Sequence, residues 1–214
     1  MQGLKPIYLA PARERAASEL RKAIISQTLK EGEILTLESV AALLQLSVTP
    51  VREAFQILAR DGLIELRHNK GAVVLGVTEK YIREHYQLRA VLESFTAAEA
   101  AREGTDISAI EDVYKISVEA EAKGQFAGYA DYNHAFHHEI WRTSGNEKLV
   151  GMLSELWNGL SMGSVVTVDQ YAKVSRKEHG EILEAIQKHD SKLAHERMEK
   201  HIYRSMQDML THYH

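Results

Sequence analysis

Few residues in this chain can interrupt a helix. Its 214 residues include 3 prolines and 13 glycines, and these residue types most often end regular structure or mark turns. A fold of many short strands needs a turn roughly every 8–12 residues. The sequence therefore predicts a mainly α protein with long helices.

Composition excludes several classes of protein and of site. Hydrophobic residues make up 44% of the chain and charged residues 26%, which is typical of a globular protein and excludes a disordered or collagen-like one. The absence of cysteine rules out disulfides, cysteine-ligated zinc and thiol catalysis. The N-terminal segment lacks an apolar signal core, and no apolar run is long enough to span a membrane. We therefore expect a cytoplasmic location and no membrane partner.

The two parts of the chain differ in charge and in histidine content. Net charge is −4, yet residues 1–80 hold 11 Lys and Arg against 9 Asp and Glu, whereas residues 81–214 hold 15 against 21. Ten of the eleven histidines also follow residue 80. We therefore expect an N-terminal arm over residues 1–12 and two domains with different roles, over residues 13–77 and 78–214.

The first domain has the pattern of a winged helix-turn-helix. Apolar residues recur at helical spacing over residues 13–29, 37–44 and 49–61. Two short apolar runs follow, separated by the basic segment 67–71, and this pattern is typical of a β-hairpin. A winged helix-turn-helix inserts its third helix into the major groove of double-stranded DNA, and its hairpin wing lies along the backbone or minor groove.

Residues at the start of the third helix and in the wing are candidates for DNA contacts: Ser47, Thr49, Arg52, His68, Lys70 and Gly71. The Thr49 hydroxyl can reach a phosphate, and the Arg52 guanidinium can reach O6 and N7 of a guanine. Gly71 permits close approach of the backbone. Ser47 is also expected to cap the third helix through its side chain. The alternative is that Arg52 only solvates a surface helix, but the cationic hairpin favours DNA binding.

Three motifs within residues 13–76 carry a family resemblance: LSVTPVREA at 46–54, LARDGLI at 58–64 and NKGA at 69–72. On these motifs the sequence resembles the GntR family of bacterial transcription regulators. Two positions depart from the family pattern, because Val48 and Ser39 stand where members carry arginine. The resemblance implies a homodimer that binds double-stranded operator DNA, more often as a repressor.

The second domain is predicted to be an all-α bundle. A long helix from residue 78 or 79 to about 102 precedes five or six more, with breaks expected near Gly104, Gly124, Gly145, Gly163 and His189. Residues 81–101, 136–146 and 178–186 resemble the FCD ligand-binding domain of the FadR subfamily, over about 79–211. Many members hold a divalent metal through Asp or Asn and three histidines. Matched by motif, the ligands here are Asn133, His137, His179 and His201, with Asn133 in place of the commoner Asp.

Helical spacing tests this ligand set independently of the resemblance. Segment 125–144 offers two i,i+4 pairs, Asn133 with His137 and His134 with His138, and either could chelate one ion. The first pair borders the apolar face of the predicted helix, whereas the second is expected to face solvent. His179 and His201 fall in or beside apolar stripes of their own helices. Three imidazoles and an oxygen suit Zn²⁺ or Ni²⁺; the alternative is that these are core histidines bonded to neighbours.

Arg89 begins an R-x-x-L-E run that continues to Leu92 and Glu93. Its planar guanidinium is a candidate for pairing with the carboxylate of a small organic acid effector. A structural ion pair with a glutamate of the bundle is the alternative, and the spacing does not decide between them.

Together these patterns predict a DNA-binding transcription regulator that responds to a metabolite, and not an enzyme. A rival interpretation is a metal-dependent, hydrolase-like enzyme, because a three-histidine metal with an open position could activate water. However, no free carboxylate lies at a recognisable general-base spacing. A third is a metal-free regulator whose effector is an acyl group and whose histidines are only structural.

Overall fold

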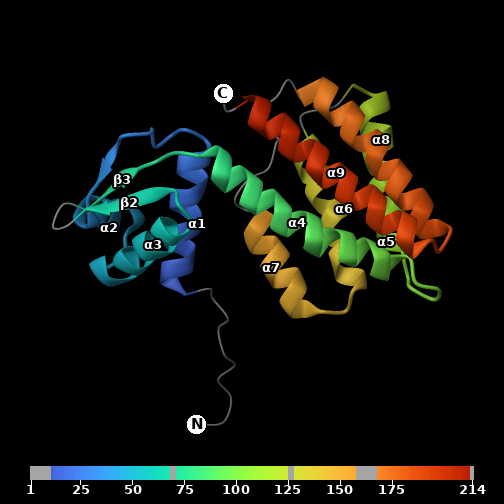
Figure 1. Ribbon diagram of the computed structural model, residues 1–214, viewed down its shortest axis with the longest axis horizontal. Helices are drawn as coiled ribbons and strands as arrows, with labels where there is room; N and C mark the ends of the chain where they lie inside the picture. Colours follow the sequence, from blue (N-terminus) through green and yellow to red (C-terminus); the bar gives the residue numbers. More distant parts are fainter. Residues whose placement is uncertain (1–10, 68–70, 125–127, 158–167, 213–214) are drawn as a thin grey trace, which may run out of the picture. The chain divides into compact units, whose positions relative to one another are not determined.

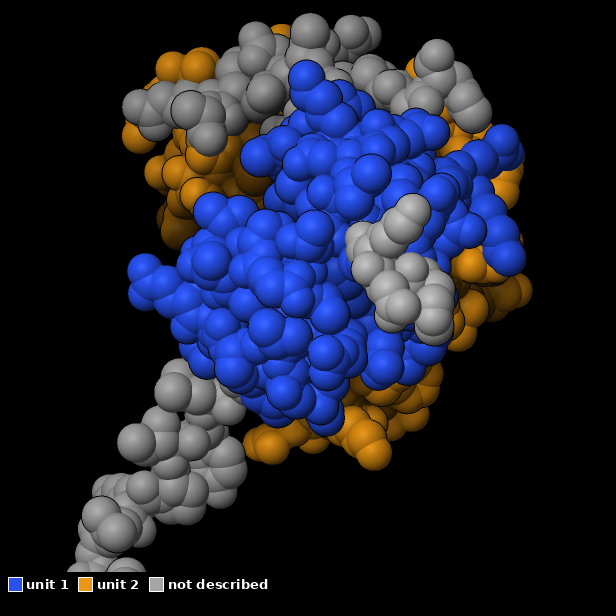
Figure 2. Space-filling model, turned by 90° about the vertical axis from the view of Figure 1, so that its left-hand side faces the viewer, with its two compact units in different colours: residues 1–81 blue, residues 82–214 orange. Residues whose placement is uncertain are grey.

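The computed structural model describes residues 11–67, 71–124, 128–157 and 168–212. These residues are mostly helical with one small sheet, which confirms the mainly α prediction. The chain forms two compact units, residues 1–81 and 82–214 (Figure 2). The domain boundary expected after residue 77 remains a prediction.

In residues 11–67 and 71–81, the N-terminal unit has three complete helices and a three-stranded sheet (Figure 1). In chain order its elements are α1 (Ala12–Ile25), β1 (Ile34–Leu35), α2 (Leu37–Leu44), α3 (Val48–Arg60), β2 (Ile64–Arg67) and β3 (Gly71–Val74). The strands are antiparallel in the order β1-β3-β2, and β2 and β3 form the predicted hairpin. Helix, helix, turn, helix and hairpin follow one another as in a winged helix-turn-helix.

Strand β1 was not predicted from the sequence. It has only two residues, which pair with Val73 and Ala72 of β3. Two residues are too few to show an alternating apolar pattern, so periodicity carries no signal for such a strand. Strand β1 forms because β3 of the hairpin has a free edge with which these two residues can pair.

Two helix ends also differ from the predictions. Helix α1 ends at Ile25 rather than at residue 29, and Gln27 adopts a left-handed conformation with φ of 57°. Ser47 precedes α3 as expected, but its side chain makes no capping hydrogen bond, so that prediction was wrong. A side-chain cap is instead found on α2, where Thr36 Oγ1 accepts a hydrogen bond from the backbone N–H of Ser39 at 3.1 Å.

Helix α3 is amphipathic, and this fixes which of its faces is free. Val51, Ala54, Phe55 and Leu58 are buried in the core of the unit. Thr49, Arg52 and Gln56 recur at helical spacing on the opposite side and are exposed. Burial of the apolar face therefore leaves a polar face of α3 open to a partner.

The C-terminal unit consists of helices in its described residues: α4 (Glu79–Ala100, which begins at the end of the first unit), α5 (Ser108–Ala122), α6 (Tyr129–Thr143), α7 (Glu147–Trp157), α8 (Val168–Gln187) and α9 (Ser191–His212). Four of the predicted breaks lie between these helices, whereas the one at Gly163 falls outside the described residues. Helix α6 packs between α5, α7 and α8, and α8 lies beside α9 (Figure 1). No described helix is both long and apolar enough to cross a membrane.

Gly71 is expected to stabilise the wing because it lets the backbone of β3 come close to that of β1. Its φ is 80°, and a Cβ at this position would overlap the backbone carbonyl oxygen of Leu35 in β1. We expect Gly71→Ala to lower the free energy of unfolding by more than about 1 kcal/mol, because it adds a steric overlap to a strained conformation. Chemical denaturation measures this loss.

Gly62→Ala is the matched control for this substitution. Gly62 has a similar φ of 76°, but no atom lies within 4 Å of an added Cβ. Both variants therefore carry the conformational strain, and only Gly71→Ala carries the overlap. Equal losses in the two variants would mean that the approach of β1 to Gly71 contributes nothing.

Candidate metal centre and nucleic-acid interface

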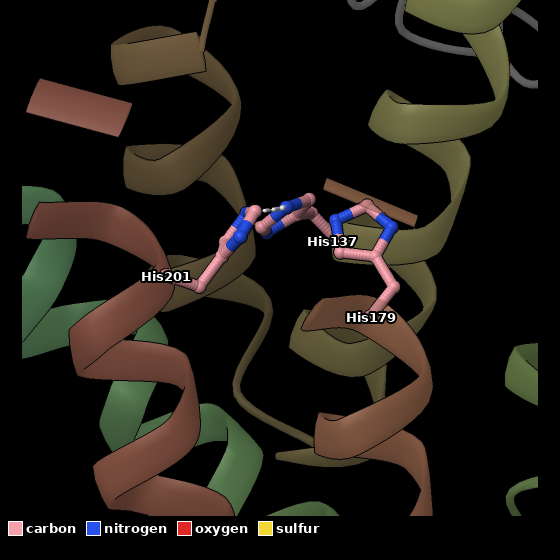
Figure 3. Close-up of side chains that lie close together, drawn as sticks. All are labelled: His137, His179 and His201. Carbon is pink, nitrogen blue, oxygen red and sulfur yellow. Dashed lines mark hydrogen bonds between the residues drawn. The ribbon is translucent and has the colours of Figure 1, made fainter. Parts of the chain in front are cut away.

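Three buried histidines from three different helices meet in the C-terminal unit. His137 of α6, His179 of α8 and His201 of α9 turn their rings toward one another (Figure 3). One ring nitrogen from each lies within 4.8 Å of the others, and all three side chains are buried. In the described part of the chain, this is the one group of histidine and carboxylate side chains close enough to share an ion.

Two of these rings are oriented by carboxylates, one buried (Glu93) and one partly buried (Glu178). His137 Nδ1 lies 2.6 Å from Glu93 Oε2, and His201 Nδ1 lies 2.7 Å from Glu178 Oε2. An ionised carboxylate only accepts hydrogen bonds, so each Nδ1 carries the proton and donates it. In a neutral imidazole the other nitrogen, Nε2, is then left with a lone pair. Because the carboxylates hold the protons on Nδ1, each Nε2 keeps a lone pair that can bind a cation.

These two Nε2 atoms face each other at 3.2 Å. Two lone pairs at this distance repel unless a proton or a cation lies between them. For comparison, two nitrogens bound to one tetrahedral zinc at about 2.0–2.1 Å are roughly 3.3 Å apart. The spacing therefore suits two ligands of a single ion.

The environment favours neutral imidazoles, the form that binds metals. Burial lowers the pKa of His179 well below its usual value, and the neighbouring His201 and His137 lower it further. Burial likewise lowers the pKa of His201 to about 4, although the hydrogen bond to Glu178 opposes the shift. His179 also stacks on Phe136, with ring centroids 4.2 Å apart. At neutral pH both rings are uncharged.

Asn133 supplies a further possible ligand atom. It lies one helical turn before His137 on α6, and its Oδ1 atom is buried without a hydrogen-bond partner in the described structure. Asn133 and His179 both line a small cavity of about 30 Å³. Because an unpaired buried oxygen is costly, a cation or a donor group at this cavity would stabilise it. Three imidazole nitrogens and an amide oxygen fit a borderline divalent ion.

Glu93 accepts hydrogen bonds from the side chains of three different residues. Besides His137 it accepts hydrogen bonds from Arg89 Nε at 2.7 Å and from Trp141 Nε1 at 3.1 Å. Burial alone would raise the pKa of Glu93, but the charge of Arg89 and the bonds to Arg89 and His137 hold it at about 2. The sequence allowed two roles for Arg89, and the structure contains one of them, the ion pair with a glutamate of the bundle. The contact of Arg89 with an effector remains a prediction.

Further charged residues around the centre were missed by sequence reasoning. Glu178 also accepts hydrogen bonds from Arg204 of α9, with Nη2 to Oε2 at 2.6 Å. Arg176 of α8 pairs with Glu121 of α5, and both line the cavity beside Asn133. Two signals were available, because Glu178 immediately precedes His179 and Glu93 ends the run that begins at Arg89. Arg176 has no such signal, since its partner lies 55 positions away.

The second histidine pair of α6 is not solvent-facing as expected. His134 and His138 are half-buried, and the His134 ring lies 5.2 Å from the Trp157 ring and 6.1 Å from that of Trp141. The expectation failed because α7 covers this side of α6, which a helical wheel cannot show. Neither residue belongs to the histidine cluster.

The candidate DNA contacts divide between described and undescribed residues. Ser47, Thr49 and Arg52 are exposed around the start of α3. Gln56, one turn after Arg52 on the same face, was missed, although helical spacing could have found it. His68 and Lys70 lie outside the described residues. Gly71 opens β3, and its approach to Leu35 already explains why glycine is needed there.

Two protein-family models match the chain. Residues 12–74 match the model for bacterial regulatory proteins of the gntR family, and residues 84–204 match the model of the FCD domain. The chain is similar to the gluconate operon transcriptional repressor of Bacillus licheniformis, with 34% identity over 170 residues, which cover 76% of this chain and 67% of that protein. The repressor of the same name from Bacillus subtilis (strain 168) is 33% identical over the same shares.

The fold is also shared with solved structures. Escherichia coli McbR/YncC superposes with a TM-score of 0.68 at 19% identity, over 96% of this chain and all of that one. This likeness agrees with a winged helix-turn-helix followed by a helical domain. The chain therefore belongs to the GntR family of bacterial transcription regulators, and its C-terminal helical domain is an FCD domain.

Proposed function

We propose that this protein is a homodimeric, DNA-binding repressor whose FCD domain binds a divalent metal ion and a small organic acid. The observation that carries the ligand-binding part is the convergence of three buried histidines beside an unpaired amide oxygen. The exposed polar face of α3 supports the DNA-binding part. Repression is inferred from the relatives named as gluconate operon repressors.

Operator recognition is assigned to α3. Its exposed Thr49, Arg52 and Gln56 would lie against the major groove, with Arg52 reading a guanine and Ser47 and Thr49 contacting phosphates. His68 and Lys70 would contact the backbone from the wing. A single short helix contacts few base pairs, so two copies on paired half-sites are needed for specificity.

We assign the surface between the two copies to α4. Leu88, Val91 and Phe95 form an apolar stripe at helical spacing and are 54%, 66% and 49% exposed. Large apolar side chains grouped in this way mark an interaction surface. Because specific DNA binding needs two DNA-binding heads, we assign this surface to contact with a second copy of the chain.

The metal would be held by His137, His179 and His201, with Asn133 as the oxygen ligand, and Zn²⁺ or Ni²⁺ suits this set. When bound, such an ion supplies a Lewis-acidic anchor for a carboxylate. The effector would enter the cavity lined by Asn133, His179 and Arg176. Gluconate is the first organic acid to test, because of the names of the relatives.

Arg52→Ala is expected to weaken binding to the operator by about 1–3 kcal/mol, because a two-bond contact with a guanine is lost. Binding to random duplexes should change much less, since phosphate contacts carry no sequence information. Titration of fluorescent operator and random duplexes at one salt concentration measures both effects.

Arg60→Ala is the control, because Arg60 is an exposed arginine at the far end of α3. It should leave the preference for the operator intact. An equal loss for Arg52→Ala on both duplexes would reassign Arg52 to a phosphate contact. A half-site that binds as tightly as the full operator would contradict the dimer.

The metal centre predicts one zinc ion per chain and a clear division among the histidine variants. His137→Ala and His179→Ala should each weaken zinc binding by at least about tenfold, because too few ligands remain to displace water from the ion. The measurement is competition with a chromophoric chelator, supported by elemental analysis.

His134→Ala and His138→Ala are matched controls, since these histidines lie on the same helix but outside the cluster. They should bind zinc as the parent does. Zinc loss in these variants with retention in His137→Ala would place the site on the other side of α6. Absence of zinc and nickel binding in the parent would favour the metal-free, acyl-binding alternative.

A further inference from the structure

The helix-turn-helix itself carries few positive charges for DNA. From Ile34 to Val51, a segment that covers β1, α2 and the first turn of α3, the sequence contains no lysine or arginine. Arg52 is the first cation after this segment. Affinity for DNA depends on lysine and arginine side chains that neutralise phosphates. A further cation beside the start of α3 must therefore come from a neighbouring element.

Helices α1 and α3 run parallel, as two ion pairs between them show. Arg21 Nη2 lies 2.6 Å from Asp61 Oδ2, and Arg13 Nη1 lies 3.9 Å from Glu53 Oε2. Both pairs join residues 40 positions apart, 21 to 61 and 13 to 53. A step along α1 thus corresponds to an equal step in the same direction along α3, so both helices start at the same end of the unit.

The start of α3 projects beyond the start of α1 by less than the depth of the major groove. With the same offset, Ala12 at the start of α1 is level with Arg52, and α3 begins four residues earlier at Val48. Four residues span at most about 6 Å along the groove's depth, whereas the major groove is about 8.5 Å deep. When the first turn of α3 reaches the base edges, the first turn of α1 therefore lies near the level of the phosphates.

Arg13 is the cation of this first turn that faces α3. It precedes the buried Ala16 and Ala17 by three and four positions, so it continues the stripe by which α1 packs on the core. Its carboxylate neighbours, Glu53 and Glu14, lie 3.9 and 4.0 Å away, and its own side chain is 51% exposed. Exposed ion pairs of this length contribute little. The guanidinium can therefore exchange these partners for a phosphate at small cost.

We infer that Arg13 is a DNA-contacting residue, which binds a backbone phosphate beside the major groove that receives α3. The inference rests on the proposed DNA-binding function and goes beyond it, because it extends the interface from the helix-turn-helix and the wing to α1. A guanidinium binds a phosphate through charge-assisted hydrogen bonds. Because phosphates carry no sequence information, this contact adds affinity for any duplex and adds no preference for the operator.

The test measures binding of the full-length protein to a fluorescein-labelled duplex of random sequence over a range of salt concentrations. Arg13→Ala should weaken binding at low salt by about tenfold. The slope of log affinity against log salt should become shallower by about one for each bound DNA-binding head. Arg13→Lys should keep most of the affinity and the slope, because a single positive charge is enough for a phosphate. An unchanged slope in Arg13→Ala would overturn the inference.

Arg15→Ala is the matched control. Arg15 is an exposed arginine on the same first turn of α1, but two helical positions rotate its side chain by about 200° from that of Arg13, which is away from α3. Both variants lose one positive charge, so any effect of net charge on DNA binding appears in both. Arg15→Ala should keep nearly the parental affinity. Equal losses in the two variants would contradict a specific contact of Arg13.

The same titrations distinguish failure of this contact from failure of the proposed function. A parent protein that binds the duplex, with Arg13→Ala indistinguishable from it, would overturn the contact and leave DNA binding by α3 standing. A parent protein that binds no duplex even at low salt would overturn the proposed function, and the contact of Arg13 with it.

Discussion

The geometry of the histidine cluster in the FCD domain depends on one buried carboxylate, that of Glu93. It is fully buried, and it accepts hydrogen bonds from Arg89 on its own helix and from His137 and Trp141 on α6. A buried charge is tolerated only when it is paired and its lone pairs are satisfied. These three donors meet that condition, and in doing so they fix α6 against α4 and fix the tautomer of His137. The position of a candidate ligand is therefore a consequence of satisfying Glu93.

A similar arrangement is found at Glu178, although this carboxylate is only partly buried. Glu178 orients His201 and is balanced by Arg204, just as Glu93 orients His137 and is balanced by Arg89. Each carboxylate thus directs a histidine without adding net charge to the site. Second-sphere partners of this kind hold a ring nitrogen in position and raise its basicity. Both histidine rings are therefore held in fixed orientations within the cluster.

The two compact units divide the physical tasks. In the N-terminal unit, burial of one face of α3 leaves a short row of polar side chains free for DNA. In the C-terminal unit, several polar side chains point inward instead, and those of Glu93 and His137 bond to each other between helices, whereas Asn133 Oδ1 has no partner in the described structure. Helix α4 is continuous in sequence with both, because it starts at Glu79 and carries Arg89 and Glu93. Arg89 and Glu93 thus lie on the helix that directly follows the wing in the sequence.

Sequence alone determined the helical class, the helix-turn-helix with its hairpin, and the inward position of His137, His179 and His201. These features depend on local periodicity and turn chemistry, which the order of residues contains. Sequence did not determine strand β1, the cover that α7 gives to His134, or the pairing of Arg176 with Glu121. Each of these depends on segments brought together only by packing, and no local pattern records such a contact. The identity of Glu93 and Glu178 as partners of the histidines belongs to the same group. Only the tertiary structure shows which donors a buried carboxylate meets, because that choice is made when all buried polar groups must be satisfied together.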